Sequence, residues 1–393
     1  MTDKKPYFDT LAIHGAERKK KPDNALNEPI YMTSTFTFDS LDAAEAAFTF
    51  ASEDYVYTRG NNPTLRLLEQ RMALLEQGAD AVAFASGMAA ISSVLLSLLK
   101  PGDELIAHRV LYGSAHNVIT RLLPSYGIKT RLVDLTDNAN LQRVLSKKTK
   151  AVYFETPANP GLDIIDIEAV STLAAAAGAK TVVDNTFATP YFQRPLSLGA
   201  DVVVHSATKY LSGHGDVVAG IAVSSCAEYA ARLKFDFMCE LGGVLSPFNG
   251  WLVLRGLKTL GLRMRQHQQN AMEAARWLAA HPRVERVFYP GLESSPGHQL
   301  AGKQMSGFGA MLSFDVGPDQ SKARSVVEKL QMAKLAVSLG DCETLVEHPF
   351  AMTHRGYSEE DIAALGLSPG LIRLSVGLED WRDIIEDLEQ ALR

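Results

Sequence analysis

Residues 201–220 read DVVVHSATKYLSGHGDVVAG and contain a short apolar run, small hydroxyl residues and then Lys209. An apolar run without polar alternation is typical of a strand in a parallel sheet that helices cover on both faces. Lysine is rarely buried, because its charge is costly to remove from water. The position of Lys209 directly after such a strand therefore needs an explanation from the rest of the chain.

Similar strand-like runs alternate with helical segments over residues 62–245. One helix is predicted over PTLRLLEQRMALLEQ (63–77), where Pro63 suits a helix start. This alternation predicts an α/β fold with a mainly parallel sheet in a large domain, residues 62–245. The predicted strands are DAVAFAS (80–86), DELIAH (103–108), IKTRLVD (128–134), KAVYFET (150–156), KTVVDN (180–185), DVVVHSA (201–207) and VAGIAVS (218–224).

The pattern changes after residue 245. Ser246 and Pro247 cap one long predicted helix that extends to about residue 281, and the strands GAMLSFDV (309–316) and LIRLSVG (371–377) follow. A last helix places an apolar face toward the core. These elements predict a smaller C-terminal α+β domain, residues 246–393. Residues 1–61 hold few periodic patterns and are predicted to be an arm that contacts a neighbouring subunit.

Composition and charge exclude several functional classes. The net charge of -6 gives no basic surface for nucleic acid or an anionic membrane. No apolar run approaches the length of a membrane span, and the start MTDKKPYFDT lacks the apolar core of a secretory signal. The three cysteines are not spaced as metal ligands. We therefore expect a cytoplasmic protein with no metal site, no membrane partner and no nucleic-acid partner.

Chemically useful residues follow four of the predicted strands, where ligands bind in open α/β sheets. Ser86, Gly87 and Met88 open a helix, whose free amides suit a phosphate. Glu155 and Asn159 follow a second strand, Asp184 follows a third, and Ser206, Thr208 and Lys209 follow the fourth. Each feature alone has an ordinary structural explanation: turn or cap residues, local hydroxyl hydrogen bonds, and a surface lysine.

Together these features match what pyridoxal phosphate requires. A lysine of the protein forms a Schiff base with the aldehyde of the cofactor. A carboxylate keeps the ring nitrogen of the cofactor protonated, so that the ring accepts electrons. The sequence contains no GxGxxG turn after the first strand, no GxxxxGK[ST] loop and no HExxH. His205 and His214 flank Lys209 without metal-ligand partners at useful spacing, which favours packing or loop hydrogen bonds for both.

Seven motifs resemble, in order, the cystathionine and methionine metabolism family of fold type I pyridoxal phosphate enzymes. The resemblance covers nearly the whole chain and implies a homotetramer of two tight dimers, with an amino-acid substrate and active sites shared between subunits. The motifs are YVYTRGNNPT (55–64), ASGMAAI (85–91), ETPANP (155–160), VVDNTFATP (182–190), SATKYLSGHGDVVAG (206–220), VSLGDCETLVEHPFAMTH (337–354) and IRLSVGLED (372–380).

The resemblance also implies a role for individual residues. Lys209 is the covalent lysine and Asp184 the partner of the ring nitrogen, while Tyr112 stacks on the ring and acts in proton transfer. Asn159 and Arg373 hold the substrate carboxylate. From the residues alone, Arg373 in an apolar strand needs an anion, either this carboxylate or a nearby Glu. The residues implied to bind the phosphate are Gly87, Met88, Ser206 and Thr208, together with Tyr57 and Arg59 from the neighbouring subunit.

Within the family, the chain most resembles methionine γ-lyases, which release methanethiol, 2-oxobutanoate and ammonia. Val337, before Ser338, stands where cystathionine-handling members typically have Glu, and an apolar residue there suits a methyl thioether. Asn117 stands where some cystathionine γ-lyases carry Arg. Ser114 replaces a Cys that most methionine γ-lyases have, and FMCELGG (237–243) replaces a Lys-Asp pair found in many of them.

Three alternatives stay open. Ser114 and KQMSGFGAMLSFDV (303–316) resemble O-succinylhomoserine sulfhydrylases, so an O-succinyl- or O-acetylhomoserine sulfhydrylase is one alternative. A cystathionine γ-lyase or synthase is the second, because these enzymes share the scaffold. The third is a catalytically silent binding or regulatory protein on the same fold, although every expected catalytic residue type is present.

Overall fold

The computed structural model describes residues 6–18, 21–353, 360 and 366–393, so His354 at the end of one motif lies outside the described residues. The seven predicted strands form one sheet in the order β1-β7-β6-β5-β4-β2-β3. Only β7 runs antiparallel to its neighbours, β1 and β6, which confirms the mainly parallel sheet. The strands are β1 (Asp80–Phe84), β2 (Glu104–His108), β3 (Lys129–Val133), β4 (Thr149–Glu155), β5 (Lys180–Asp184), β6 (Val202–Ser206) and β7 (Gly220–Ser224).

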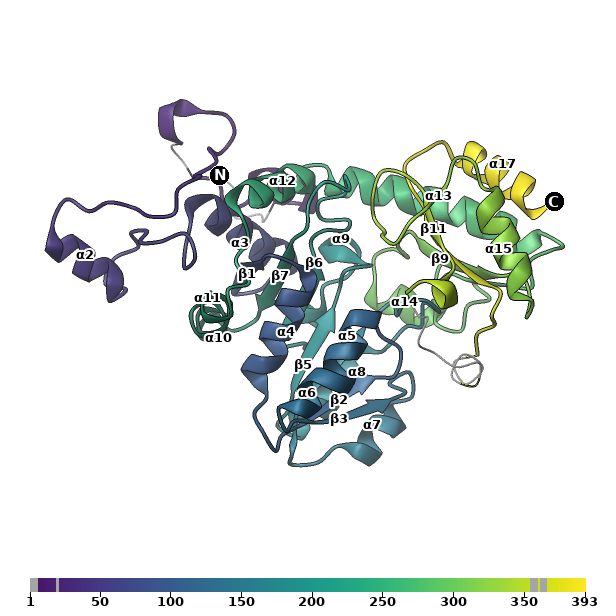
Figure 1. Ribbon diagram of the computed structural model, residues 1–393, viewed down its shortest axis with the longest axis horizontal. Helices are drawn as coiled ribbons and strands as arrows, with labels where there is room; N and C mark the ends of the chain where they lie inside the picture. The colour runs from purple at the N-terminus through teal and green to yellow at the C-terminus, as the bar shows by residue number, and fades with distance from the viewer. Residues whose placement is uncertain (1–5, 19–20, 354–359, 361–365) are drawn as a thin grey trace.

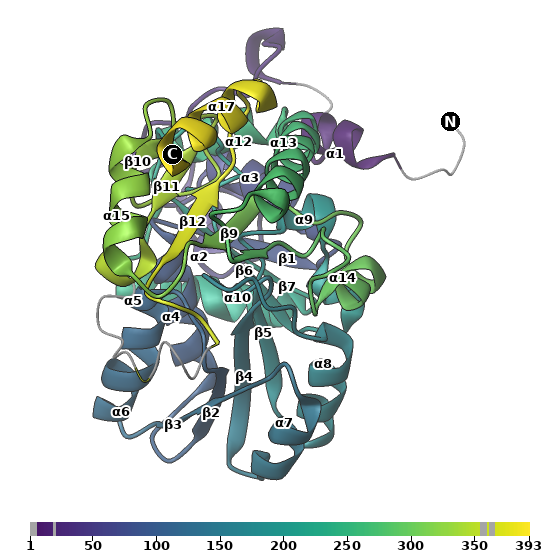
Figure 2. The same cartoon turned by 90° about the vertical axis from the view of Figure 1, so that its right-hand side faces the viewer.

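Helices cover this sheet on both faces (Figure 2). Tyr153 and Val182 pack toward one group of helices, and their neighbours Val152 and Val183 pack toward the other. Both faces of the strands are therefore buried, which explains why the runs lack polar alternation. One face carries α4 (Gly87–Leu98), α5 (Gly113–Asn117) and α6 (Leu123–Ser125), and the other carries α7 (Asn138–Val144) and α8 (Ile167–Ala176).

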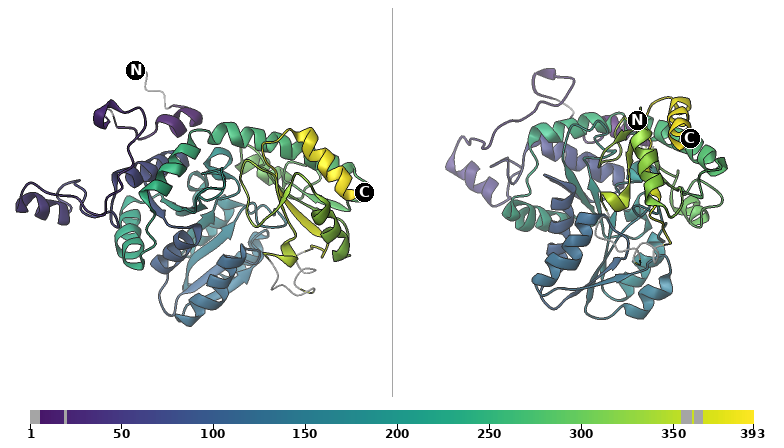
Figure 3. Two further views of the ribbon diagram at one scale, coloured as in Figure 1. Left: turned by 45° about the horizontal axis from the view of Figure 1, so that its top comes forward. Right: turned by 45° about the vertical axis from the view of Figure 1, so that its right-hand side comes forward.

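A second sheet has the order β10-β11-β12-β9-β8. The C-terminal helix packs here through an apolar face, on which Ile384, Leu388 and Leu392 are buried and Trp381 and Ile385 are partly exposed. This end of the molecule lies opposite the N-terminal arm (Figure 3). The elements are β8 (Arg286–Phe288), β9 (Met311–Asp315), β10 (Lys334–Leu335), β11 (Leu345–Glu347), β12 (Leu371–Ser375), α14 (His298–Gln304), α15 (Gln320–Lys329) and α17 (Trp381–Leu392).

The prediction of one long helix after Pro247 is wrong. The segment forms α12 (Pro247–Leu257) and α13 (Leu260–Ala280), with a break at residues 258–259. Arg263 explains the break, because its Nη2 donates to the Gly256 carbonyl at 2.8 Å and its Nε donates to Thr259 Oγ1 at 3.1 Å. The guanidinium thus occupies an acceptor that a continuous helix would use for its own backbone.

Only part of the N-terminal segment extends away from the molecule. The helix α1 (Phe8–His14) packs on α3 (Pro63–Glu76) and α13 of the same chain. The helix α2 (Leu41–Phe48) projects from the body (Figure 1), and Leu41 is 83% exposed. Such exposure of a large apolar side chain leaves this face of α2 uncovered by the described residues.

Short helices complete the described part of the chain. None of the helices among the described residues is both long and apolar enough to cross a membrane. The remaining elements are η1 (Pro22–Asn24), η2 (Val118–Leu122), α9 (Thr189–Phe192), η3 (Pro195–Leu198), α10 (Ala227–Arg232), η4 (Leu233–Met238), α11 (Cys239–Leu241) and η5 (Pro349–Ala351).

Candidate active site

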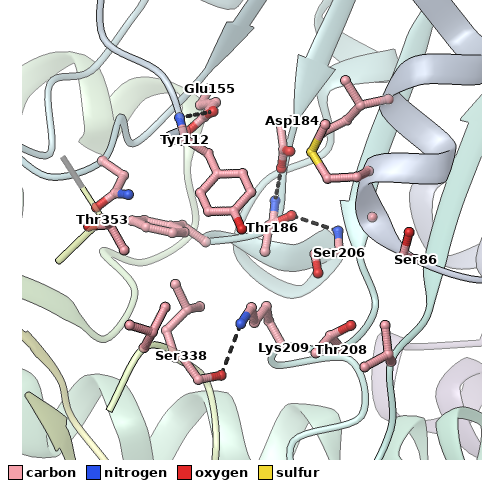
Figure 4. Close-up of a pocket in the computed structure, with 18 of the residues that line it drawn as sticks. Ser86, Tyr112, Glu155, Asp184, Thr186, Ser206, Thr208, Lys209, Ser338 and Thr353 are labelled. Atoms are coloured by element: carbon pink, nitrogen blue, oxygen red, sulfur yellow. Dashed lines mark hydrogen bonds between the residues drawn. The ribbon is translucent and has the colours of Figure 1, made fainter. Parts of the chain in front are cut away.

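A cavity of about 260 Å³ lies beyond the carboxyl ends of β4, β5 and β6, and the segment before β11 closes its other side (Figure 4). Parallel strands bring their end residues to one edge of the sheet, which is why separate motifs meet here. Twelve of the predicted site residues line it: Ser86, Gly87, Met88, Tyr112, Asn159, Asp184, Ser206, Thr208, Lys209, Val337, Ser338 and Arg373.

Lys209 lies in the turn after β6 and points into the cavity (Figure 4). Its Nζ donates to Ser338 Oγ at 2.9 Å, so two distant motifs meet at the amine. Burial lowers the pKa of Lys209, and the Asp341 carboxylate partly opposes this. The amine is therefore neutral more often than that of an exposed lysine.

Asp184 and Glu155 end neighbouring strands and are paired in register. Burial raises the pKa of both carboxyls, and for Glu155 the nearby Asp184 charge raises it further. Asp184 Oδ1 accepts a hydrogen bond from the Thr186 N–H at 3.0 Å, which favours its charged form. The Tyr112 N–H donates to Glu155 at 2.7 Å and likewise favours its charged form. Asp184 has more such partners, since Thr186, His205 and Tyr153 all lower its pKa, and we therefore place the charge on Asp184 and a proton on Glu155.

The start of α4 packs against the end of β6. Ser86 caps the helix by accepting from the Ala89 N–H at 3.1 Å, which leaves the amides of Gly87 and Met88 for a ligand. A Cβ on Gly87 would lie 2.8 Å from the Cβ of Ser206, so only glycine fits here. The Ser206 hydroxyl has no hydrogen-bond partner among the described residues, but Thr208 Oγ1 already bonds the backbone of Ala219.

Arg373 contacts a nearby Glu, which is one of the two anionic partners that its sequence position allowed. Its Nη1 contacts Glu347 Oε1 at 3.0 Å and also donates to Asn159 Oδ1 at 3.0 Å, while its Nη2 donates to the Ser338 carbonyl at 3.0 Å. Its buried Nε has no hydrogen-bond partner within the described part of the chain. The edge formed by Nε and Nη2 therefore keeps free N–H groups for a carboxylate.

Four residues that the family resemblance singles out do not line the cavity. Tyr57 and Arg59 lie next to each other on the arm, with the guanidinium 5.9 Å from the ring centroid, and Tyr57 is 48% exposed. Ser114 lies on α5 outside the cavity, and Asn117 lines a separate surface hollow. The position of Tyr57 and Arg59 outside the cavity of their own chain is used below in the proposal on subunit assembly.

The structure adds residues to which the sequence assigned no role. Thr186, Phe187 and Thr353 line the cavity, and Glu347 supports Arg373 from the neighbouring strand. The sequence singles out Glu155 at its strand end without assigning it a role, and the structure places it beside Asp184. No sequence signal marks Glu347, because its partner lies 26 residues away (373 − 347) and the pairing depends on the register of β11 and β12.

The two histidines beside Lys209 have ordinary structural contacts. His205 Nε2 lies 2.6 Å from Glu76 Oε1 in the interior, and His214 Nδ1 lies 2.6 Å from the Ser212 carbonyl. Within the described residues, no three His, Cys, Asp or Glu side chains are grouped as metal ligands would be.

Comparisons with known proteins agree with this geometry. A family model for the Cys/Met metabolism PLP-dependent enzymes matches residues 9–393. The chain belongs to this family. An L-methionine gamma-lyase from Fusobacterium nucleatum subsp. polymorphum is 46% identical over 100% of this chain and 99% of its own length. One from Pseudomonas putida is also 46% identical, over 100% of this chain and 98% of its own.

Solved structures of other family enzymes have the same fold. Cystathionine gamma synthase from Xanthomonas oryzae pv. oryzae, in complex with cystathionine, is 41% identical with a TM-score of 0.93 over 99% of this chain and 98% of its own. A putative O-acetylhomoserine (thiol)-lyase from Campylobacter jejuni is 34% identical with a TM-score of 0.94, over 98% of this chain and 99% of its own. That structure carries a pyridoxyl-lysine phosphate.

Pyridoxal phosphate is thus the cofactor of this chain, and the cavity fits it. A buried lysine, a charged carboxylate and a helix start with free amides face one space. The Ser206 hydroxyl, which has no partner among the described residues, adds a donor beside that helix start. The donor set therefore matches an aldehyde, a ring nitrogen and a phosphate.

Proposed function

We propose that the chain is a methionine γ-lyase that converts L-methionine and water to methanethiol, 2-oxobutanoate and ammonia. The observation that carries the proposal is the set of apolar residues Val337, Leu339 and Phe187 in the lining of the cavity. Among the described lining residues, the only carboxylates are Glu155 and Asp184, which end strands of the large sheet. A methyl thioether suits an apolar wall, whereas the distal ammonium of cystathionine would need an acidic partner there.

We propose that the chain's own groups bind the substrate and move its protons. The free edge of Arg373 binds the carboxylate, with Asn159 Oδ1 holding the guanidinium from the other side. The neutral Nζ of Lys209 removes the α-proton, because burial lowers its pKa and so increases the fraction of neutral amine that can act as a base. Ser338 Oγ orients that amine. When bound, pyridoxal phosphate supplies the electron sink for this chemistry.

Tyr112 has the remaining chemical role in the proposal. It lines the cavity with its ring pointing toward the centre, and its backbone is held by Glu155 (Figure 4). Its hydroxyl donates the proton that the departing methanethiolate needs as the bond between Cγ and sulfur breaks. Asp184, whose charged form is favoured by its hydrogen bond from the Thr186 N–H, would hold the ring nitrogen in its protonated form.

A substrate panel tests the proposed function. The purified holoenzyme is offered methionine, cystathionine, cysteine, or an O-acylhomoserine with sulfide, and 2-oxobutanoate, pyruvate and thiols are quantified. We expect methionine to give methanethiol and 2-oxobutanoate in equal amounts and to have the highest kcat/KM. A higher kcat/KM for cystathionine or for sulfide replacement of the acyl group would overturn the proposal in favour of a synthase, sulfhydrylase or cystathionine lyase.

We further propose a homotetramer of two tight dimers in the cytoplasm. The exposed apolar residues of α2 and the position of Tyr57 and Arg59 outside their own cavity support an arm that contacts a neighbouring subunit. The three cysteines are all unpaired, which suits a reducing compartment. Light scattering of the purified protein tests the assembly, and a monomeric mass would contradict it.

A further inference from the structure

Glu155 is a buried carboxyl group to which the proposed reaction assigns no step of its own. It ends β4, lines the active-site cavity and is 6% exposed. It lies opposite Asp184 in the register of β4 and β5, so two carboxyl groups share one edge of the sheet. A second acid at this edge is costly, because both groups leave water and their charges repel each other. A buried acid in such a cleft is a candidate for a functional role.

The proton on Glu155 limits what that role is. Burial raises the pKa of Glu155, and the nearby charge of Asp184 raises it further, so Glu155 carries the proton of the pair. As a neutral acid it offers one oxygen that accepts hydrogen bonds and one hydroxyl group. A neutral group does not balance the charge of a ring nitrogen or an ammonium group. Hydrogen bonding is the role that remains.

The hydrogen bond of Glu155 reaches the loop that carries Tyr112. Its Oε1 accepts from the Tyr112 backbone N–H at 2.7 Å (Figure 4). Glu155 ends β4, whereas Tyr112 follows β2 and precedes α5. The contact forms because β2 and β4 pair in parallel, which brings their carboxyl ends to the same edge of the sheet. Glu155 therefore ties the backbone of Tyr112 to the end of a buried strand.

The turn at Tyr112 is held through its backbone. The Tyr112 carbonyl accepts from the His116 N–H at 2.9 Å as α5 begins. A Cβ on Gly113 would lie 2.8 Å from the Thr353 carbonyl oxygen, so the turn passes close against that segment. The Tyr112 residue is 41% exposed, and its hydroxyl has no hydrogen-bond partner among the described residues. The place of the hydroxyl therefore depends on how the backbone of Tyr112 is held.

We propose that Glu155 is a positioning residue for Tyr112, because it fixes the backbone from which the phenol donates its proton to the departing sulfur. The inference rests on the proposed function, from which it takes the role of Tyr112 as the proton donor. A misplacement of about 1 Å can cost about a hundredfold in rate, so a lost backbone anchor has a measurable effect. Glu155 acts through Tyr112 and transfers no proton to the substrate itself.

Two variants of the holoenzyme test the need for the acceptor oxygen. Glu155→Leu is of similar size but offers no acceptor, and it should lower kcat about tenfold or more while KM stays within about threefold, because Arg373 is unchanged. Glu155→Gln keeps an acceptor oxygen and should keep kcat within about threefold of wild type. Glu155→Ala, which also lacks the acceptor, takes the place of the leucine variant if that variant does not fold. Equal losses of kcat in Glu155→Leu and Glu155→Gln would overturn the proposal.

A double variant tests whether Glu155 acts through Tyr112. In the Tyr112→Phe background, adding Glu155→Leu should lower kcat by less than about twofold, because the hydroxyl that Glu155 positions is already gone. The same tenfold loss in both backgrounds would overturn the proposal. It would show that Glu155 acts on another group, such as the neighbouring Asp184.

Fluorine NMR separates a failure of this inference from a failure of the proposed function. The holoenzyme is prepared with 3-fluorotyrosine at its 12 tyrosines, and the Tyr112 signal is the one missing from Tyr112→Phe. This signal should shift in Glu155→Leu and keep its position in Glu155→Gln. An unchanged signal in Glu155→Leu would overturn the inference. A wild-type kcat in Tyr112→Phe would contradict the proposed acid instead, while the signal would still report where Tyr112 lies.

Asp315→Ala is the matched control for the loss of a buried carboxyl group. Asp315 is 7% exposed, lies outside the active-site cavity, and its Oδ1 accepts from the Gly317 N–H at 2.8 Å. The variant should lower the free energy of unfolding and leave both kcat and the Tyr112 signal unchanged. If Asp315→Ala changes kcat and the Tyr112 signal as Glu155→Leu does, the effect is not specific to Glu155 and the proposal is overturned.

Discussion

Lys209 shows how position changes the chemistry of a residue. Its amine is partly buried, and that burial lowers its pKa, while the carboxylate of Asp341 acts in the opposite direction. A lowered pKa means that the neutral amine appears at a lower pH than in an exposed lysine. The reactivity of Lys209 should follow this neutral fraction.

The first prediction concerns the pH at which Lys209 becomes reactive. In cofactor-free protein, its reductive methylation by formaldehyde, followed by mass spectrometry, should rise with pH earlier than that of Nα-acetyl-lysine amide. In Asp341→Asn the curve should move to still lower pH, because the carboxylate that favours the charged amine is gone. A Lys209 curve that coincides with the free amine would contradict the effect of burial.

The second prediction concerns Glu347, which holds Arg373 from the neighbouring strand. Its Oε1 lies 3.0 Å from Arg373 Nη1 and accepts from Thr353 Oγ1 at 2.8 Å. Glu347→Ala should raise KM for methionine about tenfold, since the guanidinium loses a charged hydrogen bond that orients it. The value of kcat should change much less, because Glu347 does not reach the reacting atoms.

Steady-state kinetics of two variants check this assignment. Glu347→Gln keeps an oxygen acceptor for Arg373 and should keep KM within about threefold of wild type. If Glu347→Ala lowers kcat as strongly as it raises KM, Glu347 is not a positioning residue for the carboxylate site.

At the scale of elements, the contact between the start of α4 and the end of β6 decides cofactor binding. The third prediction is that Gly87→Ala weakens pyridoxal phosphate binding, because the new Cβ would lie 2.8 Å from the Ser206 Cβ and push the two elements apart. Equilibrium dialysis of the cofactor against the apoprotein measures the change, which we expect to be about tenfold or more.

A second glycine provides the matched control for Gly87→Ala. Gly302 lies within α14, and a Cβ there would have nothing within 4 Å. Gly302→Ala should leave cofactor binding unchanged and raise the free energy of unfolding by about 0.5–1 kcal/mol, as alanine does in helices. Equal cofactor affinity in Gly87→Ala and Gly302→Ala would show that the close contact does not matter.

At the scale of the whole molecule, Tyr57 and Arg59 need a second subunit if they are to reach a cofactor. The fourth prediction uses two variants, Arg59→Ala and Lys209→Ala, each with strongly reduced turnover. When the two are co-expressed, the whole population should regain about a quarter of wild-type activity, because about half of the dimers are mixed and each mixed dimer carries one intact site of two. No recovery would show that each arm serves its own chain.

Element types were predictable because they depend on local patterns. The seven strands of the large sheet and α3 appear where apolar periodicity places them. The break between α12 and α13 was not predictable, because it depends on Arg263 bonding the Gly256 carbonyl after the chain has folded. The register of β11 and β12, which sets Glu347 opposite Arg373, was not predictable either, because it is fixed only when the two strands pair in the folded chain.

The sequence by itself determined the fold class and the family, and it predicted a cofactor-binding set of which most residues line one cavity, since these depend on residue types at strand ends. The tertiary structure alone decided which groups share a cavity, which carboxyl of the Glu155 and Asp184 pair carries the charge, and that Arg373 keeps a free edge. The reason is that hydrogen bonds and burial arise between segments far apart in the chain, and one sequence read along its length does not contain those distances.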